Sequence, residues 1–260
     1  MRLILRRHVG IYRNVQLYLL APHVYPCVTD DHVVLLDLQR DKYVGVDREQ
    51  MASLAERVKG WPLGGAPALS GSPIANEVPA PNPRGEAVVG KMLAAGMLTT
   101  DPAIGKEAKP VQVPRAEAAL VEEELETQPR VTFTHVVRFL RATALTSLAM
   151  NVRHIESVIA AAKISKSAAV RNARPVDLEA ARAAVGAFIR LRPLLFGAQD
   201  ACLFDSLALM RFLSYYGIFP TCVIGVQTGP FGAHCWVQHE AVVFNDAPEY
   251  VRRYTPILTI

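Results

Sequence analysis

The chain has 260 residues, of which 51% are hydrophobic, and its formal net charge at pH 7 is +4. This length allows two ordinary domains, and this apolar content allows a sizeable core and argues against global disorder. The small basic excess does not by itself imply a nucleic-acid partner, and no run approaches the roughly 18 apolar residues of a membrane span.

The cysteines and the N-terminal sequence indicate in which cellular compartment the protein resides. The four cysteines are irregularly spaced and form no CxxC pair: Cys27, Cys202, Cys222 and Cys235. This pattern argues against a disulfide scaffold or a zinc ribbon and favours a reducing compartment. His8 and Arg13 interrupt the apolar run that a signal peptide needs. We therefore expect a cytoplasmic protein with no membrane partner.

The first hundred residues are expected to form strands and then helices. Two β-branched and apolar runs, Val33–Leu38 and Lys42–Val46, flank a short polar turn and predict a hairpin. Val15–Leu20 is a candidate third strand. The segment REQMASLAERVKG has one apolar helical stripe and predicts a helix that stops at Gly60.

The middle of the chain alternates loop-like and helical composition. Pro, Gly and Ser dominate 61–84, which predicts a loop before a helix over roughly Gly85–Ala95. Prolines and an acidic cluster predict a linker over 101–130. Residues 131–192 have a helical pattern with ten Lys or Arg against three acids. We interpret this excess as a solvated face that lies against the acidic linker. A surface for an acidic ligand or nucleic acid is the alternative, disfavoured because no aromatic residues interleave with the charges.

Residues with catalytic chemistry gather near the C-terminus. The run DACLFDSLALMRFLSYY predicts a helix over Asp200–Tyr216, and PTCVIGV, AHCWVQ and VVFND predict three strands. Cys202 falls near the start of the helix, with Asp200 as the expected N-cap. Unpaired N–H groups there favour negative charge and so lower the pKa of a thiol. Taken alone, such a cysteine is also typical of a core.

His234 and Asp246 are the candidate partners of Cys202, because a nucleophilic cysteine needs a base and the base needs an orienting acceptor. Side chains alternate along a strand, so His234 and Trp236 share a face. If AHCWVQ and VVFND form a hairpin, His234 and Asp246 share a face only when the connection has an odd length, such as 239–241, or contains a bulge. A two-residue turn would separate them.

Two rival interpretations of these side chains stay open. His239 could be the base, although it is expected beside the turn and facing solvent. Cys202, His234 and Asp246 could bind a metal, but they lack the paired-ligand spacing of zinc motifs, so no metal is expected.

The order of nucleophile, base and carboxylate on a helix and two strands resembles that of transglutaminase-like, papain-type cysteine enzymes. More narrowly, CLFDSLALMRFLSYYGIFPTCVIGVQTGPFGAHCWVQ with VVFND after it is similar to the C-terminal half of lasso-peptide B proteins. The matching positions are Cys202, Leu203, Ser206, Leu207, Gly217, Ile218, Gly225, Val226, Ala233, His234, Trp236, Val237 and Asp246. Asp205 stands where that family often has arginine, Cys235 where it usually has alanine, and Gln238 where it often has glutamate.

The N-terminal half carries a second resemblance. DDHVVLLDLQRDKYVGVD looks like the strand pair of a PqqD-like recognition element for ribosomally made peptides, a small winged-helix fold, and MLAAGMLTT fits its closing helix. The 61–84 region departs from that pattern, because relatives usually place another helix there. Together the resemblances imply an α+β chain: a recognition element over 1–100, a linker over 101–130 and a transglutaminase-like, papain-type peptidase over 131–260.

In lasso-peptide pathways the recognition element holds the leader of a precursor peptide as an added β-strand, the peptidase removes it, and an asparagine-synthetase-like cyclase closes the ring. The resemblance thus implies a leader peptidase whose partners are that precursor and that cyclase. It implies no nucleic acid and no cofactor in the chain itself, with any ATP dependence of the reaction left open. The leader-binding candidates lie along the hairpin: Leu36, Asp37, Tyr43, Val44 and Val46.

The implied mechanism gives each candidate a role. Cys202 attacks the carbonyl before the core peptide, His234 transfers the proton, and Asp246 fixes the imidazole tautomer. Backbone N–H groups at the helix start, with Gln199 as a side-chain candidate, stabilise the oxyanion. Trp236 shields the triad, lines the substrate groove or simply fills the core.

Three other functions stay open on the sequence. The triad could transfer the acyl group to an amine, as a transglutaminase does, or the chain could be a non-catalytic chaperone that presents the precursor to the cyclase. The N-terminal winged helix could instead bind DNA, but its expected recognition helix, GEAVVGKMLAA, carries only one Lys.

Overall fold

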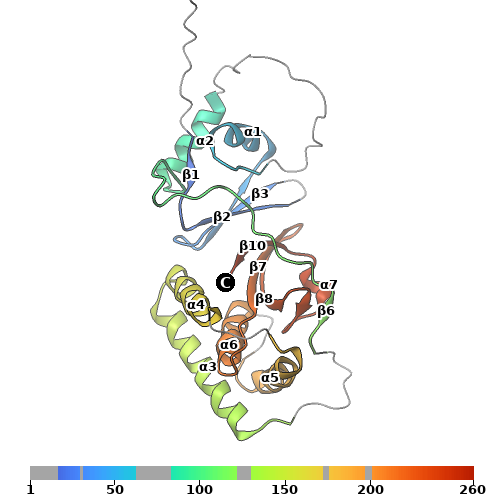
Figure 1. Ribbon diagram of the computed structural model, residues 1–260. Coiled ribbons are helices and arrows are strands. Elements are labelled where there is room, and N and C mark those ends of the chain that lie inside the picture. The colour runs from blue at the N-terminus through green and yellow to red at the C-terminus, as the bar shows by residue number, and fades with distance from the viewer. Residues whose placement is uncertain (1–16, 30–31, 63–82, 122–129, 172–175, 197–200) are drawn as a thin grey trace, which may run out of the picture.

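The computed structural model of the protein describes residues 17–29, 32–62, 83–121, 130–171, 176–196 and 201–260 (Figure 1). The described residues form an N-terminal unit and a C-terminal unit, each with a sheet and helices. The expected mixture of helices and strands is thereby confirmed, while the winged-helix class of the first unit stays a prediction.

The N-terminal unit has a three-stranded antiparallel sheet in the order β2-β3-β4. Its elements are β1 (Leu19–Leu20), β2 (Val24–Val28), β3 (Val33–Asp37), β4 (Lys42–Val46), α1 (Arg48–Arg57), α2 (Pro83–Ala94) and β5 (Leu98–Thr99). The predicted hairpin is confirmed as β3 and β4, with Val33 opposite Val46. The predicted strand over Val15–Leu20 is confirmed only at Leu19–Leu20, which form β1, and residues 15–16 lie outside the described residues. β1 pairs with β5, whereas the third strand of the hairpin's sheet is β2. Pro26 disguises β2 in the sequence, because proline is tolerated in a sheet only at an edge strand such as this one.

Local signals explain the start and end of α1. Asp47 and Gln50 form a capping box, in which the Asp47 carboxylate accepts the backbone N–H of Gln50 at 2.8 Å. The helix ends at Arg57, and Gly60 turns the chain with a φ of +73°, in the left-handed region that glycine tolerates best. The helix and its predicted stop are confirmed.

The central strand of the N-terminal sheet, β3, is buried on both faces. Side chains at Val33, Leu35 and Val46 pack into the core of their own unit. Alternate side chains at Val34 and Leu36 pack into the core of the C-terminal unit. The apolar run of β3 therefore has no solvent face. The two units share a core and are not merely tethered.

The expected linker over 101–130 is partly folded into both units. Its first residues join the N-terminal unit, where Lys106 and Leu20 exchange backbone hydrogen bonds of 2.9 Å. Farther along, β6 (Ala118–Ala119) pairs in parallel with β9 of the C-terminal sheet, and Leu120 is buried. The composition concealed this strand because a two-residue strand has no periodicity to detect. Residues 122–129, which hold the acidic cluster, lie outside the described residues.

The C-terminal unit has a five-stranded sheet in the order β10-β7-β8-β9-β6. Its other elements are α3 (Phe133–Val152), α4 (Ile155–Val170), α5 (Leu178–Leu191), a 3-10 turn η1 (Arg192–Leu194), α6 (Cys202–Ser214), β7 (Thr221–Thr228), β8 (Phe231–His239), β9 (Val242–Val243), α7 (Pro248–Val251) and β10 (Thr255–Thr259). The predicted strands are confirmed as β7, β8 and β9, although β9 covers only the first two residues of VVFND.

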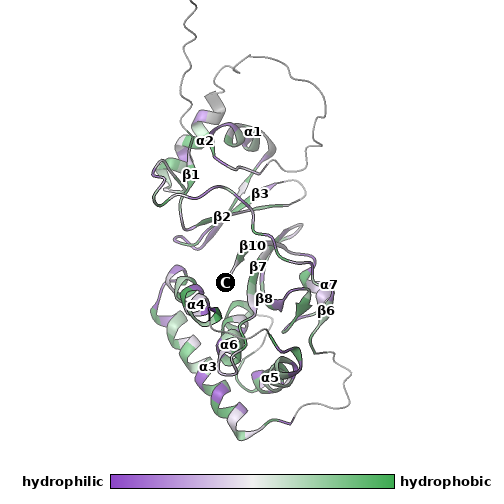
Figure 2. Ribbon diagram, in the orientation of Figure 1, coloured by the Kyte–Doolittle hydropathy of each residue, from purple (hydrophilic) through white to green (hydrophobic). Residues whose placement is uncertain are grey.

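Helix α6 lies at the centre of this unit, between the sheet and the surrounding helices (Figure 1). Its Leu209, Phe212 and Leu213 are fully buried, and Figure 2 shows the hydrophobic colour along much of its length. Cys202, its first residue, is only partly buried. The buried body of the helix thus holds a reactive side chain near the surface.

No described helix is both long and apolar enough to cross a membrane.

Candidate active site

Cys202 is the first residue of α6, and Ala201 occupies the N-cap position without a side-chain cap bond. The predicted cap at Asp200 is therefore wrong by one position, and Asp200 itself lies outside the described residues. Because no described side chain caps this helix start, its first backbone N–H groups are left to stabilise negative charge beside the sulfur. This is the environment that the sequence predicted for a reactive thiol.

His234 and Asp246 form the second half of the site. Nε2 of His234, on β8, lies 2.5 Å from Oδ2 of Asp246. The other oxygen of Asp246 accepts the backbone N–H of Ala247 at 2.8 Å, which fixes the carboxylate. With Nε2 engaged, Nδ1 is the nitrogen that remains for Cys202. The structure therefore brings the predicted base and its predicted orienting acceptor together.

The hairpin achieves this by a route that the sequence did not predict. His239 pairs with Val242, so β8 and β9 are joined by a two-residue turn in which Glu240 has a φ of +49°. That turn should have put His234 and Asp246 on opposite faces. It does not, because β9 ends at Val243 and the chain then bends.

The side chain of Asn245 holds this bend in place. Its Oδ1 accepts the backbone N–H of Val237 at 2.8 Å, where a backbone carbonyl would otherwise continue the ladder. The alternation of side chains along a strand therefore ends before Asp246. The Asp246 carboxylate can then lie on the same side of the sheet as His234. The prediction that a two-residue turn separates the pair is wrong for this reason.

The pKa values of Cys202 and His234 move in opposite directions. Burial alone would raise the pKa of Cys202, but hydrogen bonds with His234 and with the backbone N–H groups of Cys235 and Leu203 lower it overall. Burial alone would lower the pKa of His234, but hydrogen bonds with Asp246 and Cys202 raise it to about 9. Both shifts favour a thiolate on Cys202 paired with an imidazolium on His234.

Aromatic rings surround the imidazole. The centroid of His234 lies 5.1 Å from that of Tyr250, 5.2 Å from Tyr254 and 6.2 Å from Trp236. Opposite His234 on β7 stands Gly225, where a Cβ atom would come within 2.9 Å of Trp236 and Tyr254. Glycine is therefore needed for these rings to approach. Trp236 is 2% exposed, packs in a buried cluster with Val223 and Val243, and donates to Oε1 of Gln238 at 2.6 Å. It is therefore a core residue beside the imidazole and does not line an open groove.

A buried polar network connects α6 to the loop that carries Asp246. Oδ2 of Asp205 accepts Nδ2 of Asn245 at 2.8 Å and pairs with Arg192 at 3.2 Å. Burial raises the pKa of Asp205, and the hydrogen bond from Asn245 and the charge of Arg192 offset only part of that effect. Asp205 stands where the resembling family often has arginine. Here the arginine of the network is Arg192 on η1, which pairs with Asp205. Sequence reasoning missed Asn245, whose one available signal was its place before Asp246.

The leader-binding candidates divide into buried and accessible positions. Leu36, Asp37 and Val46 are buried and cannot contact a bound peptide. Asp37 instead accepts the backbone N–H groups of Gln39 and Arg40 and so closes the β3–β4 turn. Leu36 and Val46 fill the two cores. These three assignments are corrected, because β3 is covered on both faces and Val46 of β4 points into the core of its own unit.

Tyr43 and Val44 are the two candidates that remain accessible. Val44 is 39% exposed, and the half-buried ring of Tyr43 packs 5.4 Å from the ring of Phe231, at the start of β8. Among the described strands, β4 pairs only with β3, so its other edge is open. Gln199, the oxyanion candidate, lies outside the described residues.

The rival interpretations can be set against this geometry. His239 lies directly before the β8–β9 turn and forms no described hydrogen bond with Cys202 or Asp246, whereas His234 contacts both. Within the described ranges, no group of three His, Cys, Asp or Glu side chains has the arrangement of a metal site. The chemistry that the arrangement supports is nucleophilic attack by a thiolate.

Comparisons with known proteins agree with the C-terminal unit. Residues 133–259 match the model of the transglutaminase-like superfamily. A stretch of 50 residues is 46% identical to the microcin J25-processing protein McjB of Escherichia coli, and the match covers 19% of this chain but only 24% of the length of that relative. No solved structure matches the chain. Residues 133–259 therefore form a transglutaminase-like domain, and its central helix and sheet carry Cys202 and His234.

Proposed function

We propose that this protein is the leader peptidase of a lasso-peptide pathway. It binds the leader of a ribosomal precursor peptide at its N-terminal sheet and hydrolyses the bond between leader and core. The observation that carries the proposal is the group formed by Cys202, His234 and Asp246 inside a transglutaminase-like domain. The partial similarity to a microcin J25-processing protein supports the choice of substrate.

The chemistry follows from the ion pair. The thiolate of Cys202 attacks the scissile carbonyl, and the imidazolium of His234 gives its proton to the leaving amine as the C–N bond breaks. This leaves the leader as a thioester on the sulfur. His234 then takes a proton from water, whose oxygen attacks the thioester and releases the leader as a carboxylate. Asp246 remains ionised and holds the ring throughout.

Backbone N–H groups at the start of α6 stabilise the oxyanion in this mechanism. The N–H groups of Leu203 and Cys235 already face the sulfur of Cys202 and lower its pKa. Donors that are fixed before the reaction lose little free energy when charge develops on the carbonyl oxygen. Gln199 remains a proposed side-chain donor.

The open edge of β4 is the proposed binding site for the leader. An added strand forms main-chain hydrogen bonds along this edge, and Val44 supplies an exposed apolar contact. Tyr43 faces the C-terminal unit and touches Phe231, three residues before His234 on β8. A leader bound on β4 is therefore held beside the strand that carries the base, at high effective concentration.

The direct test is to mix the purified protein with its precursor peptide and measure the masses of the products. A free leader carboxylate and a free core amine are the expected products, and Cys202→Ala should produce neither. Adding a small amine distinguishes hydrolysis from transfer of the acyl group to an amine. A leader–amine conjugate in place of the free leader acid would assign transglutaminase chemistry. Processing that continues undiminished in Cys202→Ala would instead indicate a chaperone. The cyclase is the proposed partner that accepts the freed amine.

A further inference from the structure

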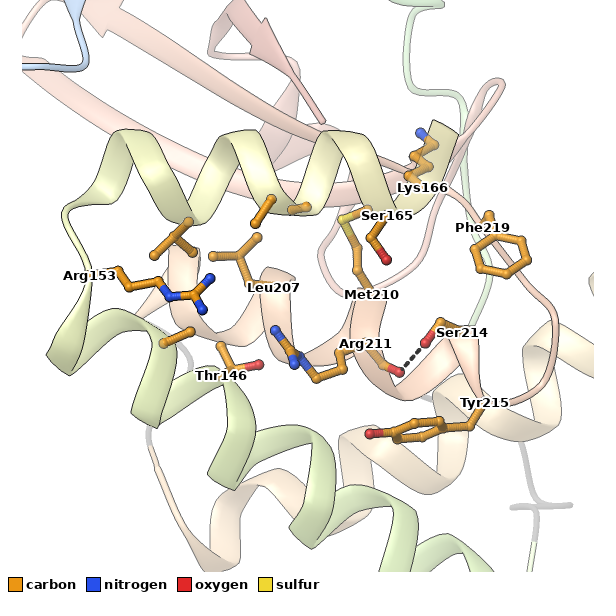
Figure 3. Close-up of a pocket in the computed structure, with 14 residues that line it drawn as sticks. Thr146, Arg153, Ser165, Lys166, Leu207, Met210, Arg211, Ser214, Tyr215 and Phe219 are labelled. Atoms are coloured by element: carbon orange, nitrogen blue, oxygen red, sulfur yellow. Dashed lines mark hydrogen bonds between the residues drawn. The ribbon is translucent and has the colours of Figure 1, made fainter. Parts of the chain in front are cut away.

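A cavity away from Cys202 is enclosed by α3, α4 and α6 (Figure 3). Its volume is about 430 Å³, within the range of ligand-binding sites. Apolar side chains from all three helices line it, including Leu207 and Met210 of α6. Figure 3 shows the guanidinium groups of Arg153 and Arg211 directed into the same space. Two cations thus meet in a largely apolar hollow.

A second cavity of about 430 Å³ continues the first along α3. It is lined by Phe133, Thr134, Val137, Arg138, Arg141 and Tyr215. Tyr215 lines both cavities and joins them. We call the joined cavities the α3 groove. It follows a helix of 20 residues, which corresponds to about 30 Å at the rise of an α-helix.

Among the described residues, nothing balances the positive charge of the α3 groove. Neither cavity has an acidic lining residue, and none of the four groove arginines forms an ion pair with a described carboxylate. Arg138 and Arg141 lie over the rings of Tyr216 and Tyr215, at 4.3 and 5.4 Å, which orients the guanidinium groups without satisfying their N–H donors. By contrast, Arg192 is paired with a carboxylate. The groove therefore favours an anionic ligand.

An exposed apolar stripe runs along α3 beside these arginines. Its members recur at helical spacing and are Phe133, Val137, Leu140, Leu148 and Val152. Phe133 is 83% exposed and Val152 73% exposed, at opposite ends of the helix. Contiguous apolar surface of this kind marks an interaction site more often than a solvated face. The occupant must therefore be apolar as well as acidic.

We propose that the α3 groove binds an acidic amphipathic helix of a partner protein. Leucine-like side chains of that helix contact the apolar stripe, and its carboxylates accept bidentate hydrogen bonds from the groove arginines. A helix of similar length to α3 reaches both cavities at once, whereas a small anion fills one. Arg211 is half-buried in the cavity wall, a place that a protruding carboxylate reaches and a flat lipid surface does not. This binding is independent of Cys202.

The test uses the full-length protein and a labelled helical peptide of about 20 residues, with leucines on one face and glutamates beside them. Fluorescence anisotropy measures its affinity. We expect the double variant Arg153→Gln/Arg211→Gln to weaken binding by about tenfold or more, and added salt to weaken binding to the unaltered protein. Arg115→Gln is the matched control, because Arg115 is exposed and outside the groove. Circular dichroism checks that the variants are folded, and Cys202→Ala should bind the peptide unchanged.

Two results would overturn this proposal. One is equal affinity for a peptide in which every glutamate is replaced by glutamine, since the groove would then not recognise charge. The other is unchanged peptide binding in the folded double variant. If that variant lost binding to vesicles of anionic phospholipid and kept binding to the peptide, the surface would be reassigned to lipid.

Discussion

The two sheets contribute to one core but differ in what they offer to a substrate. Apart from Asp37, the buried positions of the N-terminal sheet are apolar, and its accessible feature is the backbone edge of β4. The C-terminal sheet instead lies beside a chain of bonded polar groups, from Arg192 on η1 through Asp205 on α6 to Asn245 in the loop of Asp246. Recognition of a peptide through a strand edge depends on few side chains. Catalysis depends on several side chains that are held in position by their hydrogen-bond partners. Substitutions in the two sheets should therefore have separable effects.

A pair of cysteines shows the same contrast on a smaller scale. Cys235 is fully enclosed, and burial with a thiol neighbour at Cys222 raises its pKa well above the ordinary value. Cys202 is near enough to receive the backbone N–H of Cys235, yet its pKa is lowered. Access to the imidazole of His234, and not proximity to the sheet, makes the difference.

The largest expected effect is that of Cys202→Ala. Cleavage of the precursor should fall by about 10⁴-fold or more, because the nucleophile is lost, while leader affinity should stay unchanged because β4 is untouched. Product masses and leader anisotropy measure the two effects separately. Cys222→Ala is the control, since Cys222 is buried away from the imidazole and should remain active. Full activity in Cys202→Ala would contradict the assignment of Cys202 as the nucleophile.

Asp246→Asn should reduce kcat/KM by about 10²- to 10⁴-fold and change its pH profile. In the unaltered protein the rate should rise with pH as the thiol ionises and fall as His234 loses its proton, at a pH of about 9. Without the carboxylate, the pKa of His234 should decrease, so the alkaline limb should move to lower pH. An alkaline limb that stays in place would show that Asp246 does not control the imidazole.

Asn245→Ala should have an intermediate effect. It removes the acceptor for Val237 N–H and a donor to the buried carboxylate of Asp205, so the free energy of unfolding should fall by about 1–3 kcal/mol. The rate should fall about tenfold because Asp246 is held less well. Denaturant titration and kcat measurements check the two expectations. Asn151→Ala is the matched control, since the described side-chain bond of Asn151 is to Ser147 at the surface. A loss of stability with full kcat would contradict the positioning role.

The smallest expected effect is the loss of leader affinity on substitution at the unpaired edge of β4. Val44→Asp should weaken leader binding about five- to tenfold, because a desolvated carboxylate replaces an apolar contact, and should leave the turnover of a short peptide without leader unchanged. Titration of labelled leader measures the affinity. Val170→Asp alters a comparably exposed valine on α4 and should bind the leader normally. Equal leader affinity in the two variants would remove Val44 from the binding site.

Local patterns were sufficient to predict the β3–β4 hairpin, α1 and α6, because strand alternation and helical stripes are properties of neighbouring residues. The choice of Cys202, His234 and Asp246 also depended on local signals together with a resemblance. How Asp246 reaches His234 was not predictable in this way, because the bend after Val243 depends on a hydrogen bond between Asn245 and Val237. The burial of Leu36 was missed for a related reason: a strand pattern does not reveal what covers its second face.

The shared core has a consequence for producing the protein in pieces. Cys27, Val34 and Leu36 fill space in the C-terminal unit, so a polypeptide that starts at α3 would present an uncovered apolar surface to water. Each half made alone should aggregate, and the two should dissolve and regain their fold only when expressed together. An exchange of the first half for that of a distant homologue should succeed only if the side chains on the joining face are exchanged with it.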